Sequence, residues 1–164
     1  MWLVEFYYKK IKKTEIPYYA KYSFFKILSK PLKKILIHLI TPYCPFNNIR
    51  VVLYKLAGFK IGKKVFIGMK CYLDDMEPQL ITIEDNVIIS FQVCLVTHGR
   101  NQGHTPITIK EKAYIGCRTT ILSGKKGIEI GSNSVIGACS LINKNIPIGE
   151  VWAGVPAKKI RGET

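Results

Sequence analysis

From Ile61 onward, aliphatic residues recur at every sixth position along the chain, with glycine or polar residues between them. The fifth position of each six-residue unit is small or β-branched, as Val65 and Cys71 are in the first two units. Positions one and five lie on the same side of a short strand, so both are expected to point inward. The units begin at Ile61, Ile67, Leu73, Ile83, Ile89, Leu95, Ile109, Ile115, Ile121, Ile130, Ile136 and Ile142, with a partial unit at Ile148. This pattern predicts a mainly β protein, a hexapeptide β-helix with three strands to a coil and about four coils.

Three insertions interrupt the repeat, and each follows the third unit of a coil. The step from Leu73 to Ile83 takes ten residues, that from Leu95 to Ile109 fourteen, and that from Ile121 to Ile130 nine. With three units to a coil, all three insertions leave from one corner, on successive levels. We therefore expect three segments to be neighbours in space: Asp74-Asp75, the loop that carries His98, and Ser123–Gly127.

The chain before the repeat is predicted to be helical. Apolar residues from Tyr22 to Ile40 recur at intervals of three and four, which is helical spacing, with Pro31 as a kink or first-turn residue. A second, short helix is predicted to run through Ala57, with Asn47 or Asn48 as its N-cap and Gly58 as its stop, and to cover the open end of the β-helix. Its expected apolar face consists of Val51, Val52, Leu53 and Leu56. The predicted organisation is an extension over 1–46, a capping helix over 47–58, the β-helix over 59–153 with a loop at 97–106, and a tail over 154–164.

Charge is concentrated in the N-terminal part. The formal net charge of the chain is +14, and residues 1–50 hold nine lysines and one arginine against Glu5 and Glu15. The extension is either an interfacial helix on anionic lipid or a helical appendage that packs on the main domain or on a neighbouring subunit. No nucleic-acid-reading motif accompanies the charge, and no run reaches the ~18–20 apolar residues that span a bilayer.

The five cysteines show no C-x-x-C pair and their number is odd, which fits a reducing compartment better than a disulfide framework. No secretory signal is recognisable at the N-terminus. We expect a cytoplasmic protein, in peripheral contact with the inner face of the cell membrane if the extension binds lipid.

The longest insertion supplies candidate acid/base residues. His98 leaves a strand directly, and its ordinary pKa of ~6.5 suits a general base near neutrality. His104 lies mid-loop and is the weaker candidate. Asp74 and Asp75 could hydrogen-bond an acceptor's hydroxyls or orient a base, although aspartate is also common in turns. A zinc site is not expected, because zinc usually takes three or four well-spaced ligands.

The stretch from about Ile49 to Arg161 resembles the hexapeptide-repeat acyltransferases, most closely the branch of galactoside and maltose O-acetyltransferases and their polysaccharide-modifying relatives. The resemblance is carried by the phased units, by Thr97-His98, by I-T-I closing the loop, and by Y-I-G-C, V-I-G-A and G-V-P-A-K-K-I-R at 114–117, 135–138 and 154–161. It implies a left-handed parallel β-helix, a homotrimer with active sites between subunits, and acetyl-CoA as co-substrate. No metal is implied.

The resemblance also implies roles for single residues. His98 matches the family's catalytic histidine, and Asp75 or its neighbour Asp74 matches an acceptor-contacting aspartate. The positions that match contacts to coenzyme A are Cys117, Ala138, Asn143, Lys144, Lys158 and Arg161. Cys117, Asn143 and Lys158 differ in type from the family's Ser, Thr and Arg, and Ile67 stands where the family has an acceptor-binding asparagine. The acceptor is therefore left open.

These observations predict an acetyl-CoA-dependent O-acetyltransferase that modifies a hydroxyl of a sugar or of a surface-glycan intermediate, with His98 as general base in a ternary complex. Two alternatives remain at this point: N-acyl transfer to an amino sugar, and a non-catalytic β-helix that serves as a scaffold. Cys117 as a covalent nucleophile is a weaker rival, because no base lies beside it in the sequence.

Overall fold

The computed structural model describes residue 10, residues 31–99 and residues 103–161 of the chain. The chain divides into two compact units, Met1–Ile35 and Leu36–Thr164. In the first unit the described residues 31–35 are helical. The predicted helix from Tyr22 to Ile40 is confirmed over 31–40, and its part at 22–30 lies outside the described residues. The second unit carries every element discussed below.

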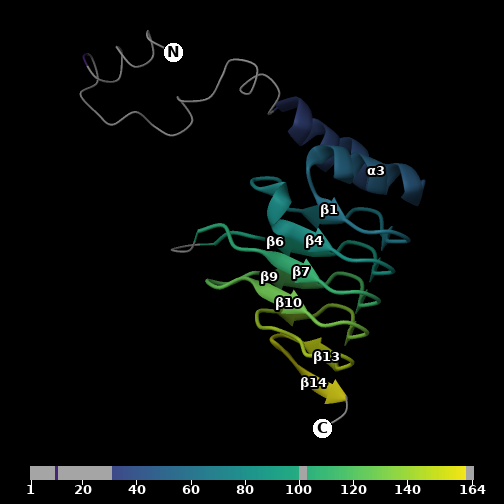
Figure 1. The fold of residues 1–164 in the computed structure, drawn as a ribbon, viewed down its shortest axis with the longest axis vertical. Coiled ribbons are helices and arrows are strands. Elements are labelled where there is room, and N and C mark those ends of the chain that lie inside the picture. The colour runs from purple at the N-terminus through teal and green to yellow at the C-terminus, as the bar shows by residue number, and fades with distance from the viewer. Residues whose placement is uncertain (1–9, 11–30, 100–102, 162–164) are drawn as a thin grey trace. The chain divides into compact units, whose positions relative to one another are not determined.

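The second unit is a parallel β-helix made of three sheets, which confirms the fold class predicted from the six-residue repeat (Figure 1). One sheet is formed by β1 (Lys60–Ile61), β4 (Ile81–Ile83), β7 (Ile107–Ile109) and β10 (Ile128–Ile130). The next is formed by β2 (Phe66–Ile67), β5 (Ile88–Ile89), β8 (Tyr114–Ile115), β11 (Val135–Ile136), β13 (Val151–Gly154) and β14 (Ala157–Arg161). The third is formed by β3 (Tyr72–Leu73), β6 (Cys94–Val96), β9 (Thr120–Leu122) and β12 (Leu141–Ile142).

The interior is a set of aliphatic columns, because equivalent residues pair coil by coil. In the first sheet, for example, Ile83 pairs with Ile61 and with Ile109. Every fifth-position residue is buried as predicted: Val65, Cys71, Val87, Val93, Ala113, Thr119, Ser134 and Ser140. The fifth-position hydroxyls find nearby carbonyls, so that Ser134 donates to Gly131 at 2.6 Å and Thr119 to Gly137 at 3.1 Å.

Two corners of each coil are turned by a single residue with positive φ. These residues are Lys64, Lys70, Asn86, Gln92, Lys112, Arg118, Asn133 and Cys139, with φ between 52° and 59°. Each is the fourth residue of its unit. At the same corners the coils approach closely, and a Cβ on Gly116 would lie 2.5 Å from the backbone nitrogen of Ala138. The third corner carries the insertions, the first of which includes the short helix η5 (Pro78–Leu80).

The repeat ends earlier than the sequence indicates. Ile148, predicted to open a fifth coil, is 72% exposed, whereas Ile146 is buried and bridges to Ile130. The chain then forms β13, which pairs in parallel with β11, and turns back as the antiparallel strand β14. An antiparallel hairpin therefore takes the place of the next coil.

In the second unit, the helical elements before the first coil are η3 (Leu36–Ile40), η4 (Thr41–Tyr43) and α3 (Asn47–Ala57). The helix α3 ends as predicted at Gly58, whose φ of 110° is in the left-handed region that favours glycine. The prediction that Asn47 or Asn48 caps this helix is wrong: the N-cap is Phe46, which makes no side-chain cap hydrogen bond. The side chain of Asn47 is used differently: it donates to the Val65 carbonyl and accepts from the Ile67 N–H, both at 3.0 Å.

The predicted apolar face of α3 is wrong for Val52 and Leu56, whereas Val51 packs against the core. The buried residues are Arg50, Tyr54 and Ala57. On the adjoining face Val52 and Leu56 are 53% and 73% exposed. The helix is apolar over more of its circumference than the β-helix covers, and sequence periodicity alone did not indicate which half is buried.

Arg50 links α3 to the first coil, although it has no carboxylate partner among the described residues. It is 2% exposed, its Nε donates to the Ile67 carbonyl at 2.7 Å, and its Nη1 donates to the Cys44 carbonyl. Burying a cation in this way is tolerated only when its donors are satisfied, because unpaired buried polar groups are costly.

We expect Arg50→Met to lower the free energy of unfolding by about 1–3 kcal/mol, because it leaves the Ile67 and Cys44 carbonyls without their buried donor. Lys55→Met is the matched control: Lys55 also donates to a coil carbonyl, that of Gly62 at 3.1 Å, but is exposed, so a change below about 0.5 kcal/mol is expected. Urea unfolding measures both. Equal effects of the two substitutions would show that burial of Arg50 is not what matters.

Candidate functional site

The three insertions meet at one corner, as their spacing predicts. Asp74 of the first insertion contacts His98 of the second, with Asp74 Oδ2 and His98 Nδ1 2.5 Å apart. Thr105 of the second insertion contacts the third, its Oγ1 lying 2.7 Å from the Oγ of Ser123 and donating to the Gly124 carbonyl at 2.5 Å. The prediction that segments far apart in the sequence gather here is confirmed.

Asp74 follows β3 and is completely buried. Its Oδ2 accepts from the backbone N–H of Thr97 at 3.0 Å and from the Thr97 hydroxyl at 2.7 Å, and its Oδ1 accepts from the Met76 N–H at 3.2 Å. Burial raises the pKa of this carboxyl, but the hydrogen bonds from Thr97 and His98 outweigh burial and hold the pKa below its usual range. Asp74 is therefore an ionised carboxylate at neutral pH.

His98 takes its orientation from that carboxylate. An ionised Asp74 can only accept a hydrogen bond, so the short contact requires a proton on Nδ1 of His98. The His98 side chain is 41% exposed, whereas that of Asp74 is not exposed at all. The contact fixes the orientation of the His98 ring against the buried carboxylate. Asp74 thus orients His98, which corresponds to one of the two roles considered from the sequence, and both of its carboxylate oxygens are used by Met76, Thr97 and His98.

His104 lies closer to His98 than the sequence indicated. The Thr105 N–H donates to the Thr97 carbonyl at 2.8 Å, which closes the loop at its stem. As a result the two imidazole rings lie 5.7 Å apart at a tilt of 49°. The Nδ1 of His104 is buried without a hydrogen-bond partner among the described residues. The Thr-Pro pair at 105–106, directly before I-T-I, is the feature of the sequence that indicates that the loop folds back to the residues where it begins.

Asp75 points to a different partner from its neighbour. Its Oδ1 lies 3.1 Å from Nε2 of His38 in η3, and the Asp75 side chain is 9% exposed. The His38 ring stacks on that of Tyr72, with centroids 5.2 Å apart and planes within 14°. The sequence singled out Asp75 but gave no indication that a residue of the N-terminal extension reaches it.

The residues matched to coenzyme A contacts lie elsewhere on the coils. Cys117 and Ala138 occupy successive levels of the corner between the second and third sheets. Asn143 and Lys144 follow β12 and are exposed, as are Lys158 and Arg161 in β14. The ammonium group of Lys144 lies 4.6 Å from the centre of the Trp152 ring. Within the part of the chain that the structure describes, no contact joins these six residues to His98.

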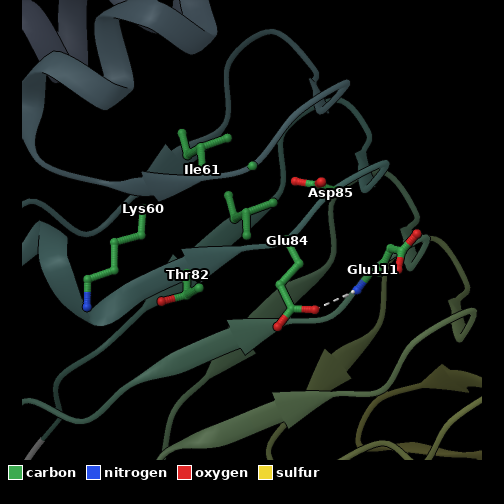
Figure 2. A pocket seen from close by; sticks show the side chains of 8 residues that line it. Lys60, Ile61, Thr82, Glu84, Asp85 and Glu111 are labelled. Carbon is green, nitrogen blue, oxygen red and sulfur yellow. Dashed lines mark hydrogen bonds between the residues drawn. The ribbon is translucent and has the colours of Figure 1, made fainter.

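A separate, shallow hollow of about 490 Å³ lies at the end of the first sheet's strands that is away from the insertions. Figure 2 shows the residues that line it: Lys60, Ile61, Gly62, Thr82, Ile83, Glu84, Asp85 and Glu111. Its carboxylates are already engaged. Glu84 accepts from the Glu111 N–H at 3.1 Å and pairs with Lys110 at 3.0 Å, and Asp85 accepts from the Lys63 N–H at 2.7 Å. The residues that line this hollow include no histidine and none of the residues predicted from the sequence as site residues. Among the described residues, no group of three or more His, Cys, Asp or Glu could hold a metal ion.

Comparison with known proteins identifies the family. No family model matches the chain. It is 37% identical over 117 residues to the galactoside O-acetyltransferase of Escherichia coli (strain K12), a match that covers 63% of this chain and 56% of that protein. The chain thus spans little more than half the length of this relative. It is 33% identical over 120 residues, covering 73% of this chain and 74% of the relative, to a Staphylococcus aureus (strain MSSA476) protein whose name assigns it provisionally to the acetyltransferases.

Solved structures agree with this assignment. A hexapeptide-repeat acetyltransferase from Vibrio cholerae superposes with a TM-score of 0.66 over 86% of this chain and 93% of that one, at 22% identity, and shows the shared fold. A galactoside acetyltransferase in complex with coenzyme A gives a TM-score of 0.56 at 28% identity, over 83% of this chain and 79% of that one. The coil repeat, the parallel β-helix and these relatives lead to one conclusion: the chain belongs to the hexapeptide-repeat acetyltransferases.

Proposed function

We propose that this protein transfers the acetyl group of acetyl-CoA to a hydroxyl of a sugar or of a surface-glycan intermediate, with His98 as the general base. The observation that carries the proposal is the contact of 2.5 Å between the buried Asp74 carboxylate and His98 Nδ1. This contact leaves Nε2 free at an exposed corner. Galactoside O-acetyltransferase among the relatives, and coenzyme A in one similar structure, support the class of reaction.

The proposed reaction is direct transfer between two bound substrates. His98 Nε2 takes the proton of the acceptor hydroxyl as that oxygen attacks the thioester carbonyl. The tetrahedral intermediate then collapses, its C–S bond breaks, and the departing thiolate takes the proton back from His98. General-base help of this kind is worth roughly 10²–10⁴-fold. The ionised Asp74 stabilises the imidazolium that exists between these two proton transfers.

The proposed coenzyme A contacts are those at Cys117, Ala138, Asn143, Lys144, Lys158 and Arg161. The last coil and the hairpin bring cationic side chains to this end of the chain, where they suit the phosphates of an anionic co-substrate. Lys158 would bind phosphate as a point charge, without the bidentate geometry of arginine. These residues lie on later coils than His98. The co-substrate would therefore run along the coils, which are about 4.8 Å apart from one level to the next.

A homotrimer is proposed as the active assembly. The outward residues of the second sheet form an apolar column over four coils: Phe66, Ile88, Tyr114 and Val135, which are 45%, 44%, 40% and 37% exposed. They stand in register across the parallel pairs. A continuous apolar column on the outside of a water-exposed β-helix is the kind of surface that subunits bury.

The acetyl-transfer proposal predicts that His98→Ala lowers kcat/KM by roughly 10²–10⁴-fold, because general-base assistance is lost. Acetyl-CoA turnover over a panel of sugars, nucleotide sugars and short glycans measures it, with mass photometry to check that assembly is unchanged. Lys60→Ala, an exposed change on β1, serves as the control. Undiminished turnover of His98→Ala would refute the mechanism. A mild defect seen only with amino sugars would favour N-acyl transfer, and failure of the wild-type protein to bind acetyl-CoA in calorimetry would favour a scaffold.

Asp74→Asn should lower kcat by roughly 10³–10⁴-fold with little change in either KM, because the amide no longer enforces the Nδ1–H tautomer. It should also remove a stabilising contribution that depends on pH. The folded-state pKa of Asp74 is lowered, so this contribution is fully present above the unfolded value of ~3.9 and is lost as the pH falls through the folded value. Urea unfolding should therefore show the wild type's advantage over Asp74→Asn to be constant above about pH 5 and to shrink below about pH 4. A difference in the free energy of unfolding between the wild type and Asp74→Asn that is the same at all pH values would contradict this prediction.

Peripheral contact with an anionic membrane is also proposed, made by the extension, residues 1–46, together with the outer face of α3 (Asn47–Ala57). Between Ile16 and Leu73 the chain has ten lysines and Arg50 but no aspartate or glutamate. The outer face of α3 adds exposed apolar side chains, with Phe46 at 66%, Ile49 at 50% and Leu56 at 73% exposure. An apolar face in a wholly basic setting suits anionic lipid, whereas pairing with the same face of another copy would bring like charges together. No helix among the described residues is long and apolar enough to cross a membrane.

Replacing Ile49 and Leu56 together by serine should abolish co-sedimentation with phosphatidylcholine vesicles that contain phosphatidylserine, because the change removes apolar area that enters the interface. The matched control replaces Ile148 and Ile160 by serine; these are 72% and 67% exposed but lie near the C-terminal end. Equal losses in both variants, or wild-type binding that does not depend on phosphatidylserine, would refute the proposal.

A further inference from the structure

The contact between His38 and Asp75 joins the N-terminal extension to the corner that carries the acid/base pair. His38 Nε2 lies 3.1 Å from Asp75 Oδ1. The two residues are far apart in the sequence, and Asp75 is adjacent to Asp74, which orients His98. A displacement of Asp75 would therefore be felt within one residue of that pair.

His38 is held by its surroundings. It lies in η3, a π-helical turn, between Ile37 and Thr41, which are 2% and 0% exposed. Its ring is stacked on Tyr72, the residue of β3 that precedes the buried Leu73. Short π-helical segments are rare and are often found at functional sites. A side chain anchored on both sides and stacked on a strand can fix the carboxylate that it contacts.

The two neighbouring aspartates differ in what they leave available. Both carboxylate oxygens of Asp74 are used within the corner, by Met76, Thr97 and His98. Asp75 engages His38 through Oδ1 only, and its Oδ2 has no hydrogen-bond partner among the described residues. Asp75 therefore presents one acceptor oxygen at the corner where the reacting hydroxyl must lie.

We propose that His38 is a positioning residue for acceptor binding. The Nε2–H of His38 donates to Asp75 Oδ1 and holds the carboxylate so that Oδ2 accepts a hydrogen bond from a hydroxyl of the acceptor next to the reacting one. This inference rests on the proposed acetyl transfer. It also specifies the acceptor further: a carboxylate that already has a histidine partner suits a neutral, polyhydroxylated ring better than an ammonium group, which would be drawn to an unpaired carboxylate.

The competing explanation is that His38 only docks the extension on the β-helix. The two accounts differ in what they require of the side chain. Docking depends on the stacked ring, and positioning depends on the donor at Nε2. His38→Phe keeps a ring to stack on Tyr72 but removes the donor, whereas His38→Gln removes the ring but keeps a donor of similar reach.

The experiment measures steady-state kinetics of the full chain with acetyl-CoA and the best neutral acceptor. We expect His38→Phe to raise the acceptor KM about 10-fold, the loss expected for one hydrogen bond to a charged group. The acetyl-CoA KM and kcat should stay within about twofold. His38→Gln should restore the acceptor KM to within about threefold of wild type. In an Asp75→Asn background, His38→Phe should change the acceptor KM by less than about twofold, because coupled residues are not additive.

Several outcomes would overturn the inference. One is an unchanged acceptor KM in His38→Phe while the wild type is active. Another is a lower Tm and a lower kcat in His38→Gln than in His38→Phe, because that result would show that the ring of His38 matters and its hydrogen-bond donor does not. A wild-type protein that transfers acetyl to no acceptor would refute the proposed function and this inference together. The two outcomes above would refute this inference alone, so the two failures can be told apart.

Discussion

The stacking of equivalent residues on successive coils is the constraint on which the rest of the structure depends. A strand of two or three residues buries little by itself, and its aliphatic residue is covered only when the coils above and below present the same position. Ile89 pairs with Ile67 and with Ile115, so each residue fills the column of the next. Exact repetition at two corners therefore leaves the third corner as the place where the chain can vary without disturbing the columns.

That division explains how the corner at His98 is preorganised. Asp74 and His98 leave adjacent strands, β3 and β6, whose backbones are fixed by parallel pairing. The buried carboxylate accepts hydrogen bonds from Met76 and Thr97 and contacts His98. In the proposed reaction, little reorganisation would therefore be needed when the imidazole becomes charged. The N-terminal extension adds to the same corner from the other side through His38, so the first insertion is held by the coil below it and by the segment that precedes the β-helix.

Features that depend on periodicity were predicted from the sequence, whereas features that depend on three-dimensional closure were missed. The burial of the fifth positions and the gathering of the three insertions at one corner both follow from the six-residue repeat. The place of His104 depends on Thr105 bonding back to Thr97, which spacing alone does not encode. The buried face of α3 depends on which carbonyls Arg50 can reach, and charged residues are normally assigned to the surface. At the corners, positive φ is adopted by Lys64 and Arg118, residue types that rarely adopt it, so the coil imposes a conformation that local preference does not indicate.

The short contact between Asp74 and His98 has a consequence for folding fidelity. A solenoid of similar coils can in principle mis-stack, since one aliphatic ladder resembles the next and a chain shifted by a whole coil would still bury its isoleucines. In such a shifted arrangement the carboxylate and the imidazole would lie on levels that no longer adjoin, and Asp74 would be buried without its donors. The pair thus favours the correct alignment of coils, because the misaligned forms that separate Asp74 from His98 are also destabilised by an unpaired buried charge.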